Sequence, residues 1–126
     1  ENAITVSNYL SNHPKIEKVF FPGTDKRHME IAQKQMDGFG GMMSFIIDSD
    51  INGVKTFLKN LNLFTLAESL GGVESLIEHP AIMTHASIDP SIREKLGISE
   101  TLLRISVGIE DVDDLISDLD QALSKI

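Results

Sequence analysis

The chain has 126 residues, enough for one hydrophobic core, and its 41% hydrophobic and 24% charged residues are typical of a globular protein. Its net charge of −8 argues against binding to nucleic acid or to anionic membranes; no apolar run approaches the roughly 18 residues of a transmembrane helix, and we expect no signal peptide. Because cysteine is absent, disulfides, thiolate catalysis and cysteine-ligated metal are excluded, and we expect a cytoplasmic protein.

Helical and strand patterns alternate along the first half of the chain. Residues 1–13 have helical spacing in Ala3, Val6 and Leu10. No capping residue precedes Glu1, so we expect the chain to begin inside a longer, interdomain helix. The patterns that follow predict a strand at 16–21, a helix at 25–36 capped by Thr24 or Asp25, a strand at 42–47, a helix at 51–60 and a strand at 63–67.

The second half begins with a short pattern at 73–78, which predicts at most two helical turns. Asp89 and Pro90 are typical of a helix N-cap and first helical position, and Gly97 predicts the end of that helix. A buried strand is predicted at 102–107. The final helix has the clearest apolar stripe, formed by Val112, Leu115, Ile116, Leu119, Leu123 and Ile126. Its other face carries acids that we expect to be solvated rather than to bind a cation: Asp113, Asp114, Asp118 and Asp120.

Arg104 is the only charged residue in the apolar stretch from Leu102 to Val107. Arginine does not lose its proton, so burial without a partner would be costly. One interpretation is an arginine on an edge strand, or one paired with an acid of the fold. The other is an arginine at a cleft, where its planar fork of donors binds a carboxylate.

Several ordered blocks of the sequence resemble one enzyme family. They are GFGGMMSF at 38–45, FTLAESLGGVESLI at 64–77, HPAIMTHAS at 79–87 and RISVGIED at 104–111. Together they resemble the C-terminal part of the Cys/Met-metabolism enzymes that use pyridoxal phosphate, such as cystathionine γ-synthase and cystathionine γ-lyase. The resemblance implies an α+β fold, the small C-terminal domain of a fold-type I enzyme, with a short, mostly antiparallel sheet and helices packed on one face. Strand-helix alternation alone would favour a parallel sheet.

The resemblance also implies roles for individual residues. It assigns Arg104 to the α-carboxylate of the substrate, Ser69 to a catalytic hydroxyl near the lysine and substrate, and Thr84 to support of the arginine. Glu68 matches the γ-synthases and γ-lyases, whereas methionine γ-lyases and many β-lyases have an apolar or aromatic residue there. We expect its carboxylate to pair with the distal ammonium of cystathionine or of incoming cysteine. The alternative is a rim residue that contacts only solvent.

The cofactor residues of these enzymes match no part of the chain. The Schiff-base lysine, the aspartate under the pyridine nitrogen and the phosphate-binding residues belong to the family's large domain. We therefore expect residues 1–126 to be the small domain alone, to hold no pyridoxal phosphate by themselves and to be inactive in isolation. The histidines at 13, 28, 79 and 85 lack metal-binding spacing, and we expect no metal site.

The sequence thus predicts the substrate-carboxylate-binding wall of a trans-sulfuration enzyme that performs γ-replacement or γ-elimination on homoserine-derived amino acids. The expected partners are cystathionine, cysteine or activated homoserine, the chain's own large domain, and further copies in a homotetramer. Two alternatives remain open: a free-standing, non-catalytic binding or assembly module, and a methionine γ-lyase or cystathionine β-lyase relative. The same wall serves synthase and lyase chemistry, so the sequence does not separate them.

Overall fold

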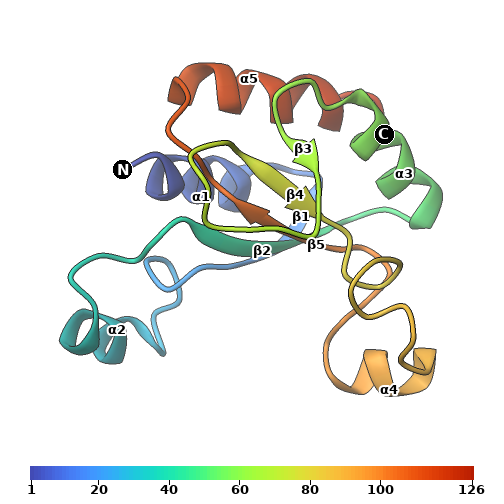
Figure 1. Ribbon diagram of the computed structural model, residues 1–126, viewed down its shortest axis with the longest axis horizontal. Coiled ribbons are helices and arrows are strands. Elements are labelled where there is room, and N and C mark those ends of the chain that lie inside the picture. Colours follow the sequence, from blue (N-terminus) through green and yellow to red (C-terminus); the bar gives the residue numbers. More distant parts are fainter.

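The computed structural model describes residues 1–126, which form one five-stranded sheet and five helices (Figure 1). The strands are β1 (Ile16–Phe20), β2 (Met42–Ile47), β3 (Thr65–Leu66), β4 (Leu76–Glu78) and β5 (Leu102–Ser106). The helices are α1 (Asn2–Asn12), α2 (Met29–Gln35), α3 (Ile51–Asn60), α4 (Pro90–Lys95) and α5 (Val112–Leu123). None of these helices is long and apolar enough to span a bilayer.

The sheet is mostly antiparallel. Its strand order is β1-β2-β5-β4-β3, and only the short β3–β4 pair is parallel. This confirms the sheet implied by the family resemblance and contradicts the parallel sheet that alternation alone would favour. Alternation failed as a guide because it does not set strand direction: β1, β2 and β5 pair antiparallel although helices and loops separate them along the chain.

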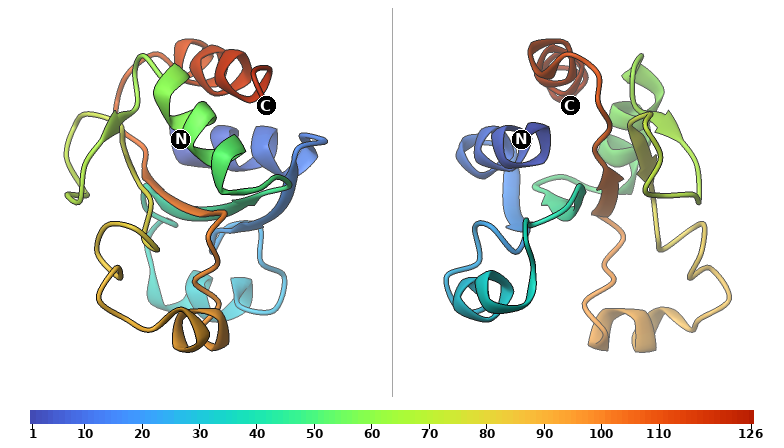
Figure 2. Two further views of the ribbon diagram at one scale, coloured as in Figure 1. Left: turned by 90° about the vertical axis from the view of Figure 1, so that its right-hand side faces the viewer. Right: turned by 60° about the vertical axis from the view of Figure 1, so that its left-hand side comes forward.

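One face of the sheet is covered by helices and contains the core. Figures 1 and 2 show α1, α3 and α5 together on that face, with α2 and α4 on the other side of the sheet. Alternate side chains of the two central strands point into this layer and are buried: Met43, Phe45, Ile47, Leu103 and Ile105. Phe45 packs edge to face against Phe57 of α3, with ring centroids 6.3 Å apart. The predicted layer of helices on one face is thus confirmed.

Local sequence signals fix the ends of several helices. The Asp89 side chain accepts a hydrogen bond from the backbone N–H of Ser91, and Gly97 follows α4 with a left-handed φ of 78°. These positions match the predicted cap and stop. The helix predicted at 25–36 is shorter, because the Asp25 carboxylate binds the backbone N–H of Arg27 and the ring of His28 in a preceding turn. Helix α2 therefore begins only at Met29.

The helical turns predicted at 73–78 were wrong. Residues 73–75 form a loop, and Leu76–Glu78 is strand β4, whose three side chains are all buried. The Ile77 carbonyl oxygen accepts the N–H of Ala67, and β5 pairs with β4 on its other side. A strand buried on both faces has no alternation, so over six residues its apolar pattern cannot be distinguished from that of a helix.

The expectation that Asp118 is solvated was also wrong. Its side chain is buried, at 5% exposure, although Asp113, Asp114 and Asp120 of the same helix are exposed. The Asp118 carboxylate accepts hydrogen bonds from three backbone N–H groups of the segment that leaves α3, those of Asn62, Leu63 and Phe64 at 2.8, 2.8 and 3.1 Å. Asp118 thereby satisfies backbone donors that no strand or helix partner reaches.

Candidate functional site

Arg104 lies in the middle of the central strand β5, opposite Ser44 of β2 and Glu78 of β4. Its neighbours Leu103 and Ile105 are buried in the core, so the Arg104 side chain extends from the opposite face, the side on which α2 and α4 lie. It is 25% exposed. The structure therefore excludes an edge-strand arginine and leaves a cation held in the centre of the sheet.

The guanidinium of Arg104 has two partners in the chain. Its Nη2 lies 2.5 Å from Oε2 of Glu78, whose side chain is only 1% exposed. The same Nη2 donates a hydrogen bond of 3.2 Å to the backbone carbonyl oxygen of Glu68. Neither Nε nor Nη1 donates to a protein acceptor. Arg104 is thus paired with an acid of the fold and still has three N–H donors free for a ligand.

Thr84 reaches the arginine only through Glu78. Its hydroxyl donates to Oε1 of Glu78 and also contacts Nδ1 of His85 at 2.8 Å. Glu78 therefore accepts a hydrogen bond from Thr84 at one oxygen and forms an ion pair with Arg104 at the other, buried oxygen, which accepts no hydrogen bond. Thr84 lies on a loop and Arg104 on strand β5, 20 positions later in the sequence.

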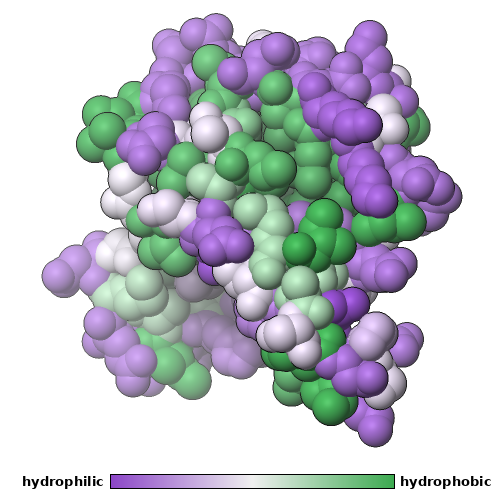
Figure 3. All heavy atoms as spheres, turned by 45° about the vertical axis from the view of Figure 1, so that its right-hand side comes forward, coloured by the Kyte–Doolittle hydropathy of each residue, from purple (hydrophilic) through white to green (hydrophobic).

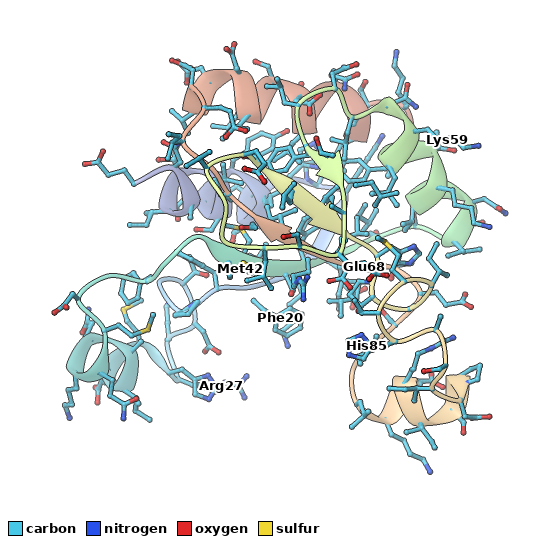
Figure 4. All side chains as sticks on the ribbon, viewed as in Figure 1. Phe20, Arg27, Met42, Lys59, Glu68 and His85 are labelled. Atoms are coloured by element: carbon cyan, nitrogen blue, oxygen red, sulfur yellow. The ribbon has the colours of Figure 1, made fainter.

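Glu68 and Ser69 lie on the loop that follows β3, and both side chains are exposed. This loop is fixed to the sheet by the Glu68 carbonyl and by the Gly71 N–H, which donates to Oγ of Ser106 at 2.8 Å. Gly71 has a φ of 76°, a conformation that favours glycine. Figure 4 shows Glu68 and His85 below the sheet, toward α4. The carboxylate of Glu68 and the hydroxyl of Ser69 make no hydrogen bond within the chain.

The surface on this side of the sheet is hollowed. Figure 3 shows a recess beneath the main body of the molecule, between two lobes that carry both polar and apolar side chains. The lobes belong to residues 22–41, which contain α2, and residues 79–101, which contain α4. The Arg104 side chain thus extends from the side of the sheet on which this recess lies.

Glu78 is the residue of this cluster that the sequence analysis missed. The signal was present, because Glu78 is the only acidic residue between Ser75 and Ala81. In the same way, Arg104 is the only charged residue in its own apolar stretch. The helical prediction for 73–78 hid it, since a helix gives no reason to place Glu78 opposite β5. Two isolated opposite charges in two buried strands are a signal for cross-strand pairing.

Two histidines, His79 and His85, lie near Glu78 and Thr84. His79 is fully buried, and its Nε2 lies 2.7 Å from the carbonyl oxygen of Glu100. Burial lowers the pKa of His79, because the charged imidazolium would lose its hydration. His85 contacts Thr84, as described above. No group of three or more histidine, aspartate or glutamate side chains in residues 1–126 is arranged to hold a metal ion.

Comparisons with known proteins agree with one another. A family model described as "Cys/Met metabolism PLP-dependent enzyme" matches residues 1–124. Cystathionine gamma-lyase of Dictyostelium discoideum is 53% identical over 126 residues, covering 99% of this chain and 33% of that protein. Cystathionine beta-lyase of Coxiella burnetii is 54% identical over 124 residues, covering 98% of this chain and 32% of that protein.

A solved structure has the same fold. Cystathionine gamma synthase from Xanthomonas oryzae pv. oryzae, in complex with aminoacrylate and cysteine, matches with a TM-score of 0.92 at 46% identity. The match covers 98% of this chain and 32% of that chain. The chain thus spans about a third of the length of the proteins it resembles.

Proposed function

Since this chain belongs to the Cys/Met metabolism PLP-dependent enzyme family, we propose that it is the C-terminal small domain of a trans-sulfuration enzyme of the cystathionine γ-synthase or γ-lyase type. Its α+β fold matches a domain of the fold-type I enzymes. In this proposal the domain forms the wall of the active site that binds the carboxylate of the amino-acid substrate.

The observation that carries the proposal is the state of Arg104. It is the only cation in the cluster, it is fixed in the central strand, and it has free donors and a partly exposed side chain. Every α-amino-acid substrate has a carboxylate, and a guanidinium binds one with well-defined geometry. The relative from Xanthomonas oryzae was solved with aminoacrylate and cysteine, both of which have this group.

Glu68 and Ser69 complete the proposed wall. Ser69 offers a hydroxyl that is free to donate or accept a hydrogen bond next to the substrate. The free carboxylate of Glu68 would pair with a distal ammonium, as in cystathionine or incoming cysteine. Because the loop is fixed to Arg104 through the Glu68 carbonyl, the two ends of the substrate would be recognised by groups held in one network.

Pyridoxal phosphate does not fit the residues of this cluster. The cofactor is held covalently by a lysine amine, and the groups that contact Arg104, Glu78 and Thr84 include none. The cofactor site would be built by residues outside this chain, in a longer protein of the length of its relatives. The role proposed for residues 1–126 is therefore to bind and orient the substrate.

The test is Arg104→Ala in the full-length enzyme. Losing a desolvated charge pair costs about 2–5 kcal/mol, so kcat/KM should fall between about 30-fold and several thousand-fold. Arg104→Lys should recover only part, because an ammonium does not reproduce the planar fork. Arg27→Ala is the matched control, since that side chain is 80% exposed. A folded Arg104→Ala enzyme with near-wild-type efficiency would refute the proposal and leave Arg104 as a structural ion-pair partner.

A second candidate is a cystathionine β-lyase. It is favoured by the relative of that name, whose identity to this chain is 54%. Product analysis separates the two, since cleavage of the β C–S bond of cystathionine releases homocysteine and cleavage of the γ C–S bond releases cysteine.

A further inference from the structure

We propose that Glu78 is a positioning residue that fixes the guanidinium of Arg104 for the substrate carboxylate. This inference rests on the proposed function of Arg104 and assigns a role to a residue that the family resemblance did not suggest. Glu78 does not itself touch the substrate. It acts by holding one side of the guanidinium, so that the other side is presented in a defined orientation.

The positions of the two residues in the sheet support this role. Glu78 and Arg104 are directly paired across the antiparallel β4–β5 ladder, on the face away from the core. Side chains at such paired positions leave the sheet next to each other and in the same direction. The backbone therefore sets their approach, and neither side chain has to bend toward the other.

The Glu78 carboxylate has one hydrogen-bonded oxygen and one oxygen whose only polar contact is the Arg104 guanidinium. One oxygen accepts the hydroxyl of Thr84, and the other lies 2.5 Å from Nη2 of Arg104. At 1% exposure, the carboxylate is out of reach of solvent. An arginine on a flexible stem normally loses much rotamer freedom when it binds a ligand, and the fixed Glu78 removes that freedom before binding.

Stability alone does not explain the pair. Buried ion pairs are often no better for stability than apolar residues of similar volume, so this pair is weak evidence for a purely structural role. Here the two partners also differ in exposure: Glu78 is sealed, whereas a quarter of the Arg104 side chain faces solvent. The Glu78 carboxylate, which does not touch the substrate in this proposal, is thus buried, whereas Nε and Nη1 of Arg104 stay available for a ligand.

The test uses Glu78→Gln in the full-length enzyme. Glutamine has the same shape, and its amide can bond to both Arg104 and Thr84, so the fold should persist. A neutral acceptor holds a guanidinium about half as strongly as a carboxylate does, and we expect KM for the amino-acid substrate to rise about tenfold with kcat within about threefold. The inhibition constant of propionate, which tests a bare carboxylate without the amine, should rise by a similar factor.

A double-mutant cycle shows whether Glu78 acts through Arg104. In the Arg104→Ala background, Glu78→Gln should have no further effect on KM or on propionate binding. Asp118→Asn is the matched control, because it changes another buried acid to its amide within the opposite, helix-covered layer. It should lower stability and leave both constants unchanged.

The outcomes separate this inference from the function on which it rests. If Arg104→Ala impairs binding while Glu78→Gln leaves KM and propionate binding unchanged or improves them, the positioning role is refuted and the proposed function stands. Equal effects of Glu78→Gln with and without Arg104 would also refute it. If Arg104→Ala itself has no effect, the proposed function fails, and the role of Glu78 fails with it.

Discussion

Replacing Asp118 by asparagine changes a single terminal group in a side chain that is 95% buried, yet it should destabilise the domain measurably. Asp118 Oδ1 accepts the N–H of Asn62, and Oδ2 accepts those of Leu63 and Phe64. An asparagine has one acceptor oxygen, so its amide nitrogen must oppose at least one of these donors. The segment between α3 and β3 would lose part of its attachment to α5.

The magnitude follows from which donors can reach water. If the asparagine oxygen keeps the hydrogen bonds from the N–H groups of Leu63 and Phe64, the N–H of Asn62 loses its acceptor. Asn62 is exposed, so its N–H can donate to water instead. The expected loss is then about 1–3 kcal/mol, the cost of one charged hydrogen bond or of one poorly satisfied group. Alanine removes all three backbone bonds, including that of the buried Phe64 N–H, together with the weaker ones from the Asn62 and Gln121 amides, and should cost about 3–5 kcal/mol.

Urea unfolding of the 126-residue chain, followed by circular dichroism, gives the free energy of unfolding of wild type and variants. Asp120→Asn is the control on the same helix, because the Asp120 side chain is 64% exposed and an asparagine oxygen can still accept its hydrogen bond from the Tyr9 hydroxyl. It should change stability by less than about 0.5 kcal/mol. If Asp118→Asn and Asp120→Asn have equal, small effects, the carboxylate of Asp118 does not hold the segment and our account of this contact is wrong.

Two further predictions concern Glu68 and His79. In the full-length enzyme, Glu68→Val should shift the ratio of kcat/KM for cystathionine and methionine toward methionine by about 1–3 kcal/mol, because a carboxylate favours a cationic distal group over a thioether methyl. An unchanged ratio would make Glu68 a rim residue. Burial lowers the pKa of His79 in the folded state below its ordinary value of 6.5. At a pH below 6.5 the unfolded chain therefore binds more protons at His79 than the folded chain does. Stability should be fully present above about pH 6.5 and fall as the pH drops toward the lowered pKa; the fall between pH 7.5 and 5.5 should be smaller in His79→Leu, and equal falls would contradict the assignment.

Elements with long periodic patterns or clear terminal signals were predictable from the sequence. Helix α3 lies at the predicted residues, and α4 has the predicted cap at Asp89 and stop at Gly97. Strands β2 and β5 also match their predicted positions closely. In each case the information is local: a capping oxygen, a glycine with a left-handed φ, or a run of apolar residues between turns.

Features that depend on distant partners were not predictable in this way. Asp118 is buried because a segment more than 50 residues earlier in the chain brings three N–H groups to it. On the helix wheel alone, it belongs with Asp114 on the solvated face. Likewise, β4 is a strand because β5 and β3 pair with it, whereas its three residues contain too little pattern to exclude a helix.

The sequence predicted most residues of the site but not the contacts between them. The resemblance named Arg104 and Thr84 as neighbours, and the structure joins them through Glu78. The sequence left open whether Arg104 pairs with an acid of the fold or binds an anionic ligand. The two interpretations are compatible in the structure, because the ion pair uses Nη2 and leaves Nε and Nη1 free. The functional roles of Arg104, Glu68, Ser69 and Thr84 remain predictions.

The proposed function divides recognition between a rigid strand and a loop, and this division has a physical reason. The carboxylate is common to all amino-acid substrates, and the residue assigned to it lies on a strand that is hydrogen-bonded on both sides, by β2 and β4. The distal groups of these substrates differ, and the residue assigned to them, Glu68, is an exposed side chain on a loop fixed at its Glu68 carbonyl and at Gly71. A substitution at Glu68 leaves those two backbone attachments in place, whereas a substitution at Arg104 leaves the buried carboxylate of Glu78 without its cation. Under the proposed function, a substitution at Glu68 should therefore change substrate preference at little cost to stability, whereas one at Arg104 should impair every amino-acid substrate.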